Sequence, residues 1–101
     1  MSVEVQNPAC GDIMRLSLRI EGGRIVDARF RARGCVPSIA CGSKLVEMLN
    51  GFELSRAAEI QREQLVAALG GLPAASQHAS YLAMDALKAA LERAMVASPK
   101  T

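Results

Sequence analysis

Aromatic side chains are almost absent from this chain, which has no tryptophan, one tyrosine and two phenylalanines. Because half of its 101 residues are hydrophobic, the core must be built from Leu, Val, Ile, Ala and Met, and the length allows one modest core. No apolar run approaches the ~20 residues of a membrane span, and the N-terminal sequence MSVEVQ lacks a signal peptide's apolar centre. We therefore expect one cytoplasmic domain over residues 1–101, without membrane association, and a disordered tail at about 97–101.

A strong net charge and an even set of cysteines are also missing. The formal net charge is +2 with 22% charged residues, which neither demands nor excludes an acidic partner. Three cysteines are an odd number, whereas small secreted disulfide scaffolds usually carry an even one. In a reducing compartment, cysteines flanked by Gly and Asp bind metals or take part in catalysis more often than they form structural disulfides.

Two runs of alternating apolar and polar residues predict two half-buried strands, separated by Gly22-Gly23. The apolar positions are Met14, Leu16, Leu18 and Ile20 in the first run, and Val26, Ala28, Phe30 and Ala32 in the second. A register slip of one residue would turn every side chain to the other face. A three-residue loop over residues 22–24 keeps both apolar sets on one face, and we expect it to connect the strands as a hairpin. A short edge strand is predicted over residues 3–5.

This register pairs Leu18 with Ala28 and Leu16 with Phe30. Extended backwards, it brings Asp12 level with Gly34 and Cys10 close to Cys35. The hairpin geometry alone therefore predicts that these two short segments meet at one end of the sheet.

The polar positions of both strands carry arginines, which form a basic strip on the outer face of the predicted sheet. A solvated strand surface is the favoured interpretation, and a docking surface for an acidic protein partner is the second. Nucleic-acid binding is disfavoured because no aromatic residue interleaves the arginines to stack bases. The arginines of the strip are Arg15, Arg19, Arg29, Arg31 and Arg33.

The second half has helical periodicity. A helix beginning near residue 37 or 38 is expected to end at Asn50-Gly51, with two short helices over about 54–69 and a long helix over about 75–96 after Leu72-Pro73. The predicted apolar face of the first helix is Ile39, Gly42, Leu45, Val46 and Leu49, and that of the long helix is Ala79, Leu82, Ala83, Ala86, Leu87, Ala90 and Ala94. Strands followed by helices predict an α+β fold, with helices over one face of a small antiparallel sheet of two to three strands.

Four side chains make a complete candidate ligand set for a metal: Cys10, Asp12, Cys35 and His78. Cys35 lies between a strand end and a helix start, where free N–H groups and the helix dipole stabilise a thiolate. The alternatives are an inert buried cysteine at Cys35, turn chemistry at Asp12 and a hydrogen-bonded packing role for His78. Cys41 is a possible substitute ligand or sulfur acceptor, although packing on the flank of its helix is the favoured role.

Several segments occur in a fixed order over nearly the whole chain: Pro8-Ala9-Cys10-Gly11-Asp12, Asp27-Ala28-Arg29-Phe30, Gly34-Cys35, Ser38-Ile39-Ala40, Leu72-Pro73, and His78 followed by Leu82-Ala83 and Asp85-Ala86-Leu87-Lys88-Ala89-Ala90. In these segments the chain resembles the iron–sulfur cluster assembly scaffolds of the IscU and NifU N-terminal type. The resemblance implies that Cys10, Asp12, Cys35 and His78 converge. It further implies a non-enzymatic scaffold that accepts sulfur from a cysteine desulfurase, binds iron, builds a 2Fe–2S cluster and passes it to recipient apo iron–sulfur proteins. In that family the aspartate is associated with a labile, transferable cluster.

The chain departs from the family pattern at two informative places. The family's third cysteine directly follows the histidine, and Ala79 occupies that position here. The chaperone-recognised stretch Leu-Pro-Pro-Val-Lys is replaced by residues 72–76, Leu-Pro-Ala-Ala-Ser, which argues against binding of a specialised chaperone.

Three functional hypotheses follow. The first is a scaffold that binds iron or a 2Fe–2S cluster at the four-residue site. The second is a zinc-bound acceptor of persulfide sulfur, because two thiolates, an imidazole and a carboxylate are a plausible tetrahedral set for zinc. The third is an interaction module that keeps the fold without the chemistry.

Overall fold

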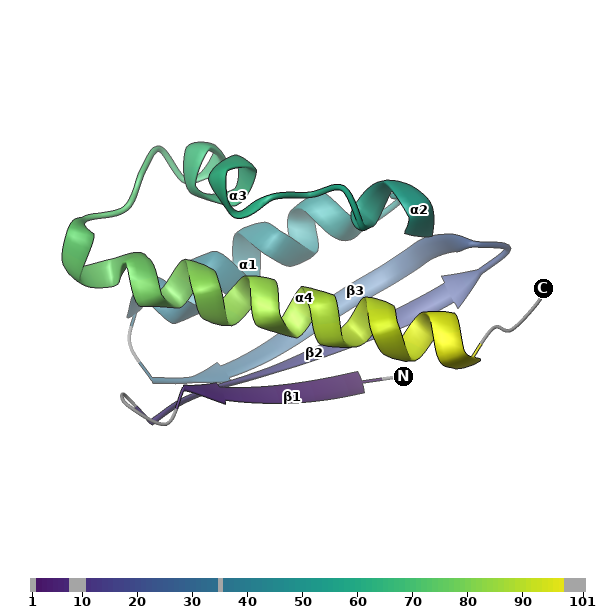
Figure 1. Cartoon of the computed structure of the whole chain (residues 1–101), viewed down its shortest axis with the longest axis horizontal. Coiled ribbons are helices and arrows are strands. Elements are labelled where there is room, and N and C mark those ends of the chain that lie inside the picture. Colours follow the sequence, from purple (N-terminus) through teal and green to yellow (C-terminus); the bar gives the residue numbers. More distant parts are fainter. Residues whose placement is uncertain (1, 8–10, 35, 98–101) are drawn as a thin grey trace.

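The computed structural model describes residues 2–7, 11–34 and 36–97, and within them it shows a sheet with a layer of helices on one face (Figure 1). The predicted α+β class is confirmed. In chain order the elements are β1 (Ser2–Asn7), β2 (Asp12–Glu21), β3 (Arg24–Arg33), α1 (Val36–Leu49), α2 (Leu54–Ala57), α3 (Arg62–Ala68), a 3₁₀ turn η1 (Ala74–Ser76) and α4 (Gln77–Ala97). Residues 8–10, 35 and 98–101 lie outside the described residues; of the expected disordered tail, Ala97 is described and is the last residue of α4.

The sheet is antiparallel with the order β1-β2-β3, so the predicted edge strand exists and is longer than expected. Its central register is the predicted one, with Leu18 opposite Ala28 and Leu16 opposite Phe30. Even-numbered residues of β2 from Asp12 to Leu18 are buried under the helices, whereas Arg15 and Arg19 are exposed on the outer face. The alternation of the sequence therefore assigns the two faces correctly.

The hairpin connection differs from the predicted three-residue loop. Glu21 pairs with Arg24 across a two-residue turn, Gly22-Gly23, in which both glycines have positive φ, 61° and 77°. Such turns match the right-handed twist of the flanking strands. The register then shifts between Arg19 and Ile20 at a β-bulge, which leaves Val26 as the extra residue of β3.

This bulge brings the apolar side chains of β2 and β3 back onto the same face of the sheet, as the three-residue loop was expected to do. It also changes which residue enters the core near the turn, because Ile25 is fully buried and Val26 is 39% exposed. The prediction that Val26 belongs to the apolar face was therefore wrong.

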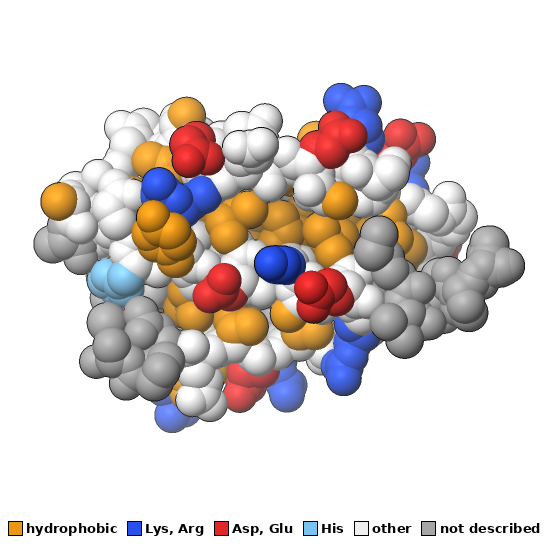
Figure 2. All heavy atoms as spheres, viewed as in Figure 1, with side chains coloured by type: hydrophobic (Ala, Val, Ile, Leu, Met, Phe, Trp, Pro, Cys, Tyr) orange, Lys and Arg blue, Asp and Glu red, His pale blue; other side chains and the backbone are white. Residues whose placement is uncertain are grey.

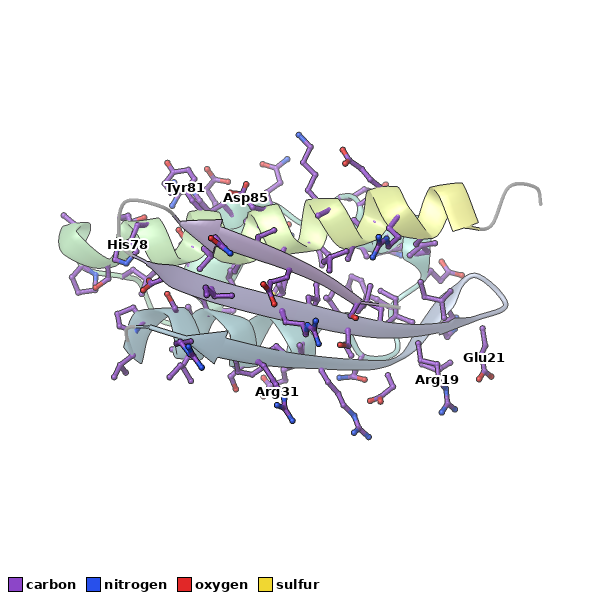
Figure 3. The ribbon with its side chains drawn as sticks, turned by 90° about the horizontal axis from the view of Figure 1, so that it is seen from below. Arg19, Glu21, Arg31, His78, Tyr81 and Asp85 are labelled. Carbon is purple, nitrogen blue, oxygen red and sulfur yellow. The ribbon has the colours of Figure 1, made fainter. Side chains whose placement is uncertain are left out.

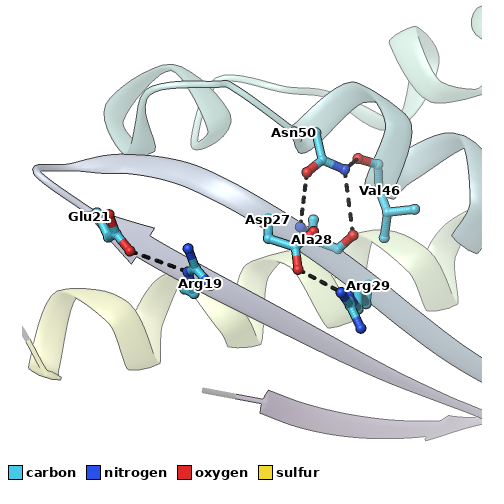
Figure 4. A network of polar contacts seen from close by, with 7 residues as sticks. All are labelled: Arg19, Glu21, Asp27, Ala28, Arg29, Val46 and Asn50. Atoms are coloured by element: carbon cyan, nitrogen blue, oxygen red, sulfur yellow. Dashed lines mark hydrogen bonds and ion pairs between the residues drawn. The ribbon is translucent and has the colours of Figure 1, made fainter.

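Asn50 holds the end of α1 against β3 beside the bulge (Figure 4). Its Nδ2 donates to the carbonyl of Val46 at 2.8 Å, and its Oδ1 accepts from the N–H of Ala28 at 3.1 Å. The predicted helix stop at Asn50-Gly51 thus also satisfies a backbone group on the edge strand.

Helices α1 and α4 supply most of the helical side of the core, and all seven predicted apolar positions of α4 are buried. Alanines at five of them keep the helix surface thin and let it lie close to the sheet. The helix begins at Gln77 after the 3₁₀ turn, two residues later than predicted. Among the described helices, none is both long and apolar enough to cross a membrane.

The buried face of α1 is rotated from the predicted one. Its buried residues are Ser38, Cys41, Gly42, Leu45 and Leu49, whereas Ile39 is 45% exposed and Val46 is partly buried. Gly42 allows α1 to approach β3, because a Cβ there would lie 2.5 Å from the ring of Phe30. Hydrophobic side chains also line a hollow of about 290 Å³ between α2 and α4, visible in Figure 2, where Ile60, Met84 and Leu91 contribute.

Candidate functional site

Asp12 is the buried acidic residue at one end of the sheet. It is the first residue of β2 and is only 3% exposed. Its Oδ2 accepts a hydrogen bond of 2.8 Å from the hydroxyl of Ser38 in the first turn of α1. A carboxylate buried this deeply requires polar partners, and Ser38 is one that the apolar periodicity of α1 did not predict.

His78 reaches the same carboxylate from the other end of the chain. It is the second residue of α4, and its Nε2 lies 3.4 Å from Oδ2 of Asp12. The imidazole is 30% exposed, so one side of the pair faces solvent while the carboxylate is enclosed. Figure 3 shows His78 at the end of the molecule opposite to Arg19 and Glu21. Two of the four predicted site residues are therefore together.

Gly34 packs directly against Asp12, as the predicted hairpin register requires. Its φ is +141°, and a Cβ at this position would lie 2.6 Å from Cγ of Asp12 and overlap Oδ1. The absence of a side chain at Gly34 thus leaves the space that the carboxylate fills. Cys35 follows Gly34 directly in the chain, and Cys10 precedes Asp12 by two residues.

Cys10 and Cys35 lie outside the described residues, so their place in the four-residue set stays a prediction. In the part of the chain that is described, no three His, Cys, Asp or Glu side chains gather closely enough to hold a metal ion. The described share of the predicted set is the pair of Asp12 and His78, which offers one oxygen and one nitrogen donor of the kinds that zinc and iron accept.

Cys41 lies in the hydrophobic core and has no solvent exposure. Its burial agrees with the favoured packing role. Cys41 lies on the buried face of α1, however, and not on the flank of the helix, where it was expected. A role as substitute ligand or sulfur acceptor stays a prediction.

Arg62 joins α3 to α4, the helix that carries His78, through polar contacts. These contacts were not predicted from the sequence. Its Nη1 donates to Oε1 of Gln77 at 2.7 Å and to Oγ of Ser80 at 3.2 Å, and its guanidinium lies 4.4 Å from the ring centre of Tyr81. Nε2 of Gln77 donates in turn to the carbonyl of Leu72. The first turn of α4 is thereby fixed on the side that does not face Asp12.

Replacing Arg62 by alanine is expected to lower the free energy of unfolding by about 1–3 kcal/mol, because the fully buried Ser80 and the partly buried Gln77 each lose a charged partner. Amide hydrogen exchange of residues 77–81 should accelerate more than that of the core of α4. Arg93→Ala is the matched control, because the hydrogen bond that Arg93 donates to the carbonyl of Ser2 is exposed. Unchanged amide exchange in the first turn of α4 would show that the contacts of Arg62 do not stabilise this turn.

The structure thus shows a small α+β domain with a buried carboxylate and a partly exposed imidazole together at one end of its sheet. Residues 1–96 match the family model described as the NifU-like N terminal domain. The chain belongs to this family.

Two similar proteins illustrate the relationship. The iron–sulfur cluster assembly scaffold protein IscU 1 of Archaeoglobus fulgidus is 41% identical over 87 residues, which are 86% of this chain and 57% of that protein. The nitrogen fixation protein NifU of a Nostoc species is 41% identical over 90 residues, 87% of this chain and 30% of that protein. The chain thus spans little more than half the length of the first of these relatives and less than a third of the second.

Solved structures support the fold. An N-terminal NifU-like protein from Brucella abortus has a TM-score of 0.55 at 16% identity, covering 94% of this chain and 67% of that one. A protein called hypothetical has a TM-score of 0.70 at 24% identity, covering 90% of this chain and 80% of that one. At these identities the likeness is one of fold alone.

Proposed function

We propose that this chain is an iron–sulfur cluster assembly scaffold, which holds iron or a 2Fe–2S cluster at Cys10, Asp12, Cys35 and His78 and is not itself an enzyme. The observation that carries the proposal is the meeting of Asp12 and His78, 66 residues apart in the chain, at 3.4 Å. Membership of the NifU-like N-terminal family supports it, as does the 41% identity to the Archaeoglobus relative, which is named an iron–sulfur cluster assembly scaffold protein. The cluster is the cargo of such a protein and not a resident cofactor.

Each ligand has a role that its chemistry suggests. Thiolates of Cys10 and Cys35 would bind iron, and imidazole can replace thiolate on a cluster iron, as histidines do in Rieske centres. Asp12 would supply a harder oxygen donor, which binds iron of a sulfide cluster less tightly than a thiolate does. Its buried hydrogen bond from Ser38 fixes the carboxylate. This set suits temporary holding and release.

The partners that the proposal requires are a cysteine desulfurase as sulfur donor and recipient apo iron–sulfur proteins. The altered stretch at residues 72–76 argues against a specialised chaperone. A cytoplasmic location is part of the proposal, because thiolate ligands persist in reducing compartments.

Anaerobic reconstitution with ferrous iron and sulfide tests the proposal. We expect visible absorbance from a bound cluster, and its loss in Cys35→Ala, because one of only two predicted thiolates is removed. Cys41→Ala is the matched control, since it also removes one thiol but from the buried core. A colourless wild-type protein, with its metal content met by zinc alone, would contradict the proposal.

A zinc-bound acceptor of persulfide sulfur is the second candidate, and Ala79 favours it. Without the family's third thiolate, the predicted set of two thiolates, one imidazole and one carboxylate fits tetrahedral zinc. Incubation with a cysteine desulfurase and cysteine should then add one sulfur atom to Cys10, Cys35 or Cys41, detectable by mass spectrometry. The third hypothesis, an interaction module without metal, predicts a melting temperature that chelation leaves unchanged.

A further inference from the structure

The five arginines on the outer face of the sheet divide into two groups with different electrostatic surroundings. Near the hairpin, Arg19 lies 3.2 Å from Glu21 and Arg29 lies 3.0 Å from Asp27 (Figure 4). Each of these two guanidiniums is matched by a carboxylate two residues away on its own strand. The hairpin end of the face is therefore balanced in charge.

The other end of the same face has an excess of positive charge. Arg15, Arg31 and Arg33 surround a hollow of about 500 Å³, and Glu4, 3.7 Å from Arg15, is the one carboxylate among the described residues that line it. Among the described residues, no carboxylate pairs with Arg31 or Arg33. In Figure 3, Arg31 lies nearer the His78 end than Arg19 does.

Two of these arginines repel each other across the sheet. Arg15 and Arg31 are direct partners in the register of β2 and β3. Like charges directly opposite each other in an antiparallel pair destabilise it. The arrangement therefore lowers the stability of the isolated domain, and an anion bound between the two guanidiniums would relieve it.

The hollow combines this positive charge with apolar surface, at the same end of the sheet as the candidate site. Ile13 is partly buried between the arginines and is the neighbour of Asp12 in β2, while Arg33 precedes Gly34. Guanidiniums bind carboxylates through paired, coplanar hydrogen bonds. On the outer face, the described strand residues include no aromatic side chain on which a nucleic-acid base would stack.

We propose that this hollow is a docking surface for an acidic segment of a partner protein, with carboxylates on Arg15, Arg31 and Arg33 and an apolar side chain on Ile13. Such a partner would be held at the same end of the sheet as Asp12 and His78, on the opposite face, near where a sulfur donor or cluster recipient must approach. That role rests on the proposed scaffold function, whereas the binding itself does not.

The test measures binding of a fluorescein-labelled peptide, Glu-Asp-Leu-Glu-Asp, to the metal-free full chain by fluorescence anisotropy at low salt. The double variant Arg31→Gln/Arg33→Gln should weaken binding about tenfold and reduce its salt dependence. The double variant Arg19→Gln/Arg29→Gln removes the same charge from the balanced end, so it should weaken binding less than about twofold. Because no metal is present, the result is independent of the reconstitution test.

Three outcomes would overturn the proposal: no saturable binding, an equal loss in both double variants, or tighter binding of a single-stranded oligothymidylate with the same dependence on Arg31 and Arg33. Thermal unfolding provides a second check. Removing Arg31 and Arg33 should leave the melting temperature unchanged or raise it, because the repulsion with Arg15 is relieved. A large drop would mean that these side chains serve the fold.

Discussion

Replacement of Gly34 by alanine is expected to destabilise the protein by more than about 3 kcal/mol and to weaken metal binding at the candidate site. A residue with a Cβ is strained at φ +141°, at a cost of about 1–3 kcal/mol. The new methyl group would also overlap the carboxylate of Asp12, which is buried and has little room to move. Denaturant unfolding and competition titration with zinc would measure the two effects.

Gly51→Ala separates backbone strain from the clash with Asp12. Gly51 also has a positive φ, +86°, but a Cβ there would meet no atom within 4 Å. Its substitution should therefore cost about 1–2 kcal/mol and leave zinc affinity unchanged. Equal losses of stability in the two variants, with zinc affinity retained in both, would mean that Gly34 does not shape the site.

The sheet and the position of Asp12 follow from the sequence, because the alternation of side chains between the two faces of a strand strongly constrains the register. Once apolar residues of two strands must share a face, Leu18 can face Ala28 but not Asp27. The details at the turn do not follow, because a two-residue turn with a bulge and a three-residue loop give the same parity. Only the twist preference of paired glycines with positive φ favours the first solution, and the bulge then moves Ile25 into the core instead of Val26.

Polar contacts inside the domain were the hardest to predict. The buried face of α1 is set partly by Ser38, whose hydroxyl binds the enclosed carboxylate of Asp12, and an analysis of apolar periodicity places Ile39 there instead. Arg62 was equally invisible, because its partners Gln77 and Ser80 become neighbours only after α3 folds back onto α4. The Asp12–Gly34 contact was derivable from local rules, whereas these contacts depend on tertiary packing.

Restoring the family's third cysteine with Ala79→Cys is expected to prolong retention of a reconstituted cluster and to raise zinc affinity by at least about tenfold. The added thiolate would directly follow His78 in α4 and increase the number of soft donors, which iron in sulfide clusters and zinc prefer. Even changes in groups that only support metal ligands alter affinity by about 10–100-fold. The decay of visible absorbance in the presence of a chelator, and competition titration with zinc, would measure the gain.

Ala83→Cys is the control that separates ligation from the mere presence of another buried thiol. Ala79 and Ala83 are both fully buried, one helical turn apart on the same face of α4, but only Ala79 adjoins His78. Both variants therefore bear a similar packing cost, and only Ala79→Cys should retain the cluster longer than the wild type. If both variants fold and lose absorbance at the wild-type rate, position 79 is not part of the site. The alanine at this position would then have no bearing on how firmly this chain holds its cargo. A gain confined to Ala79→Cys would instead show that position 79 adjoins the metal and that a thiolate there sets how firmly the site holds it.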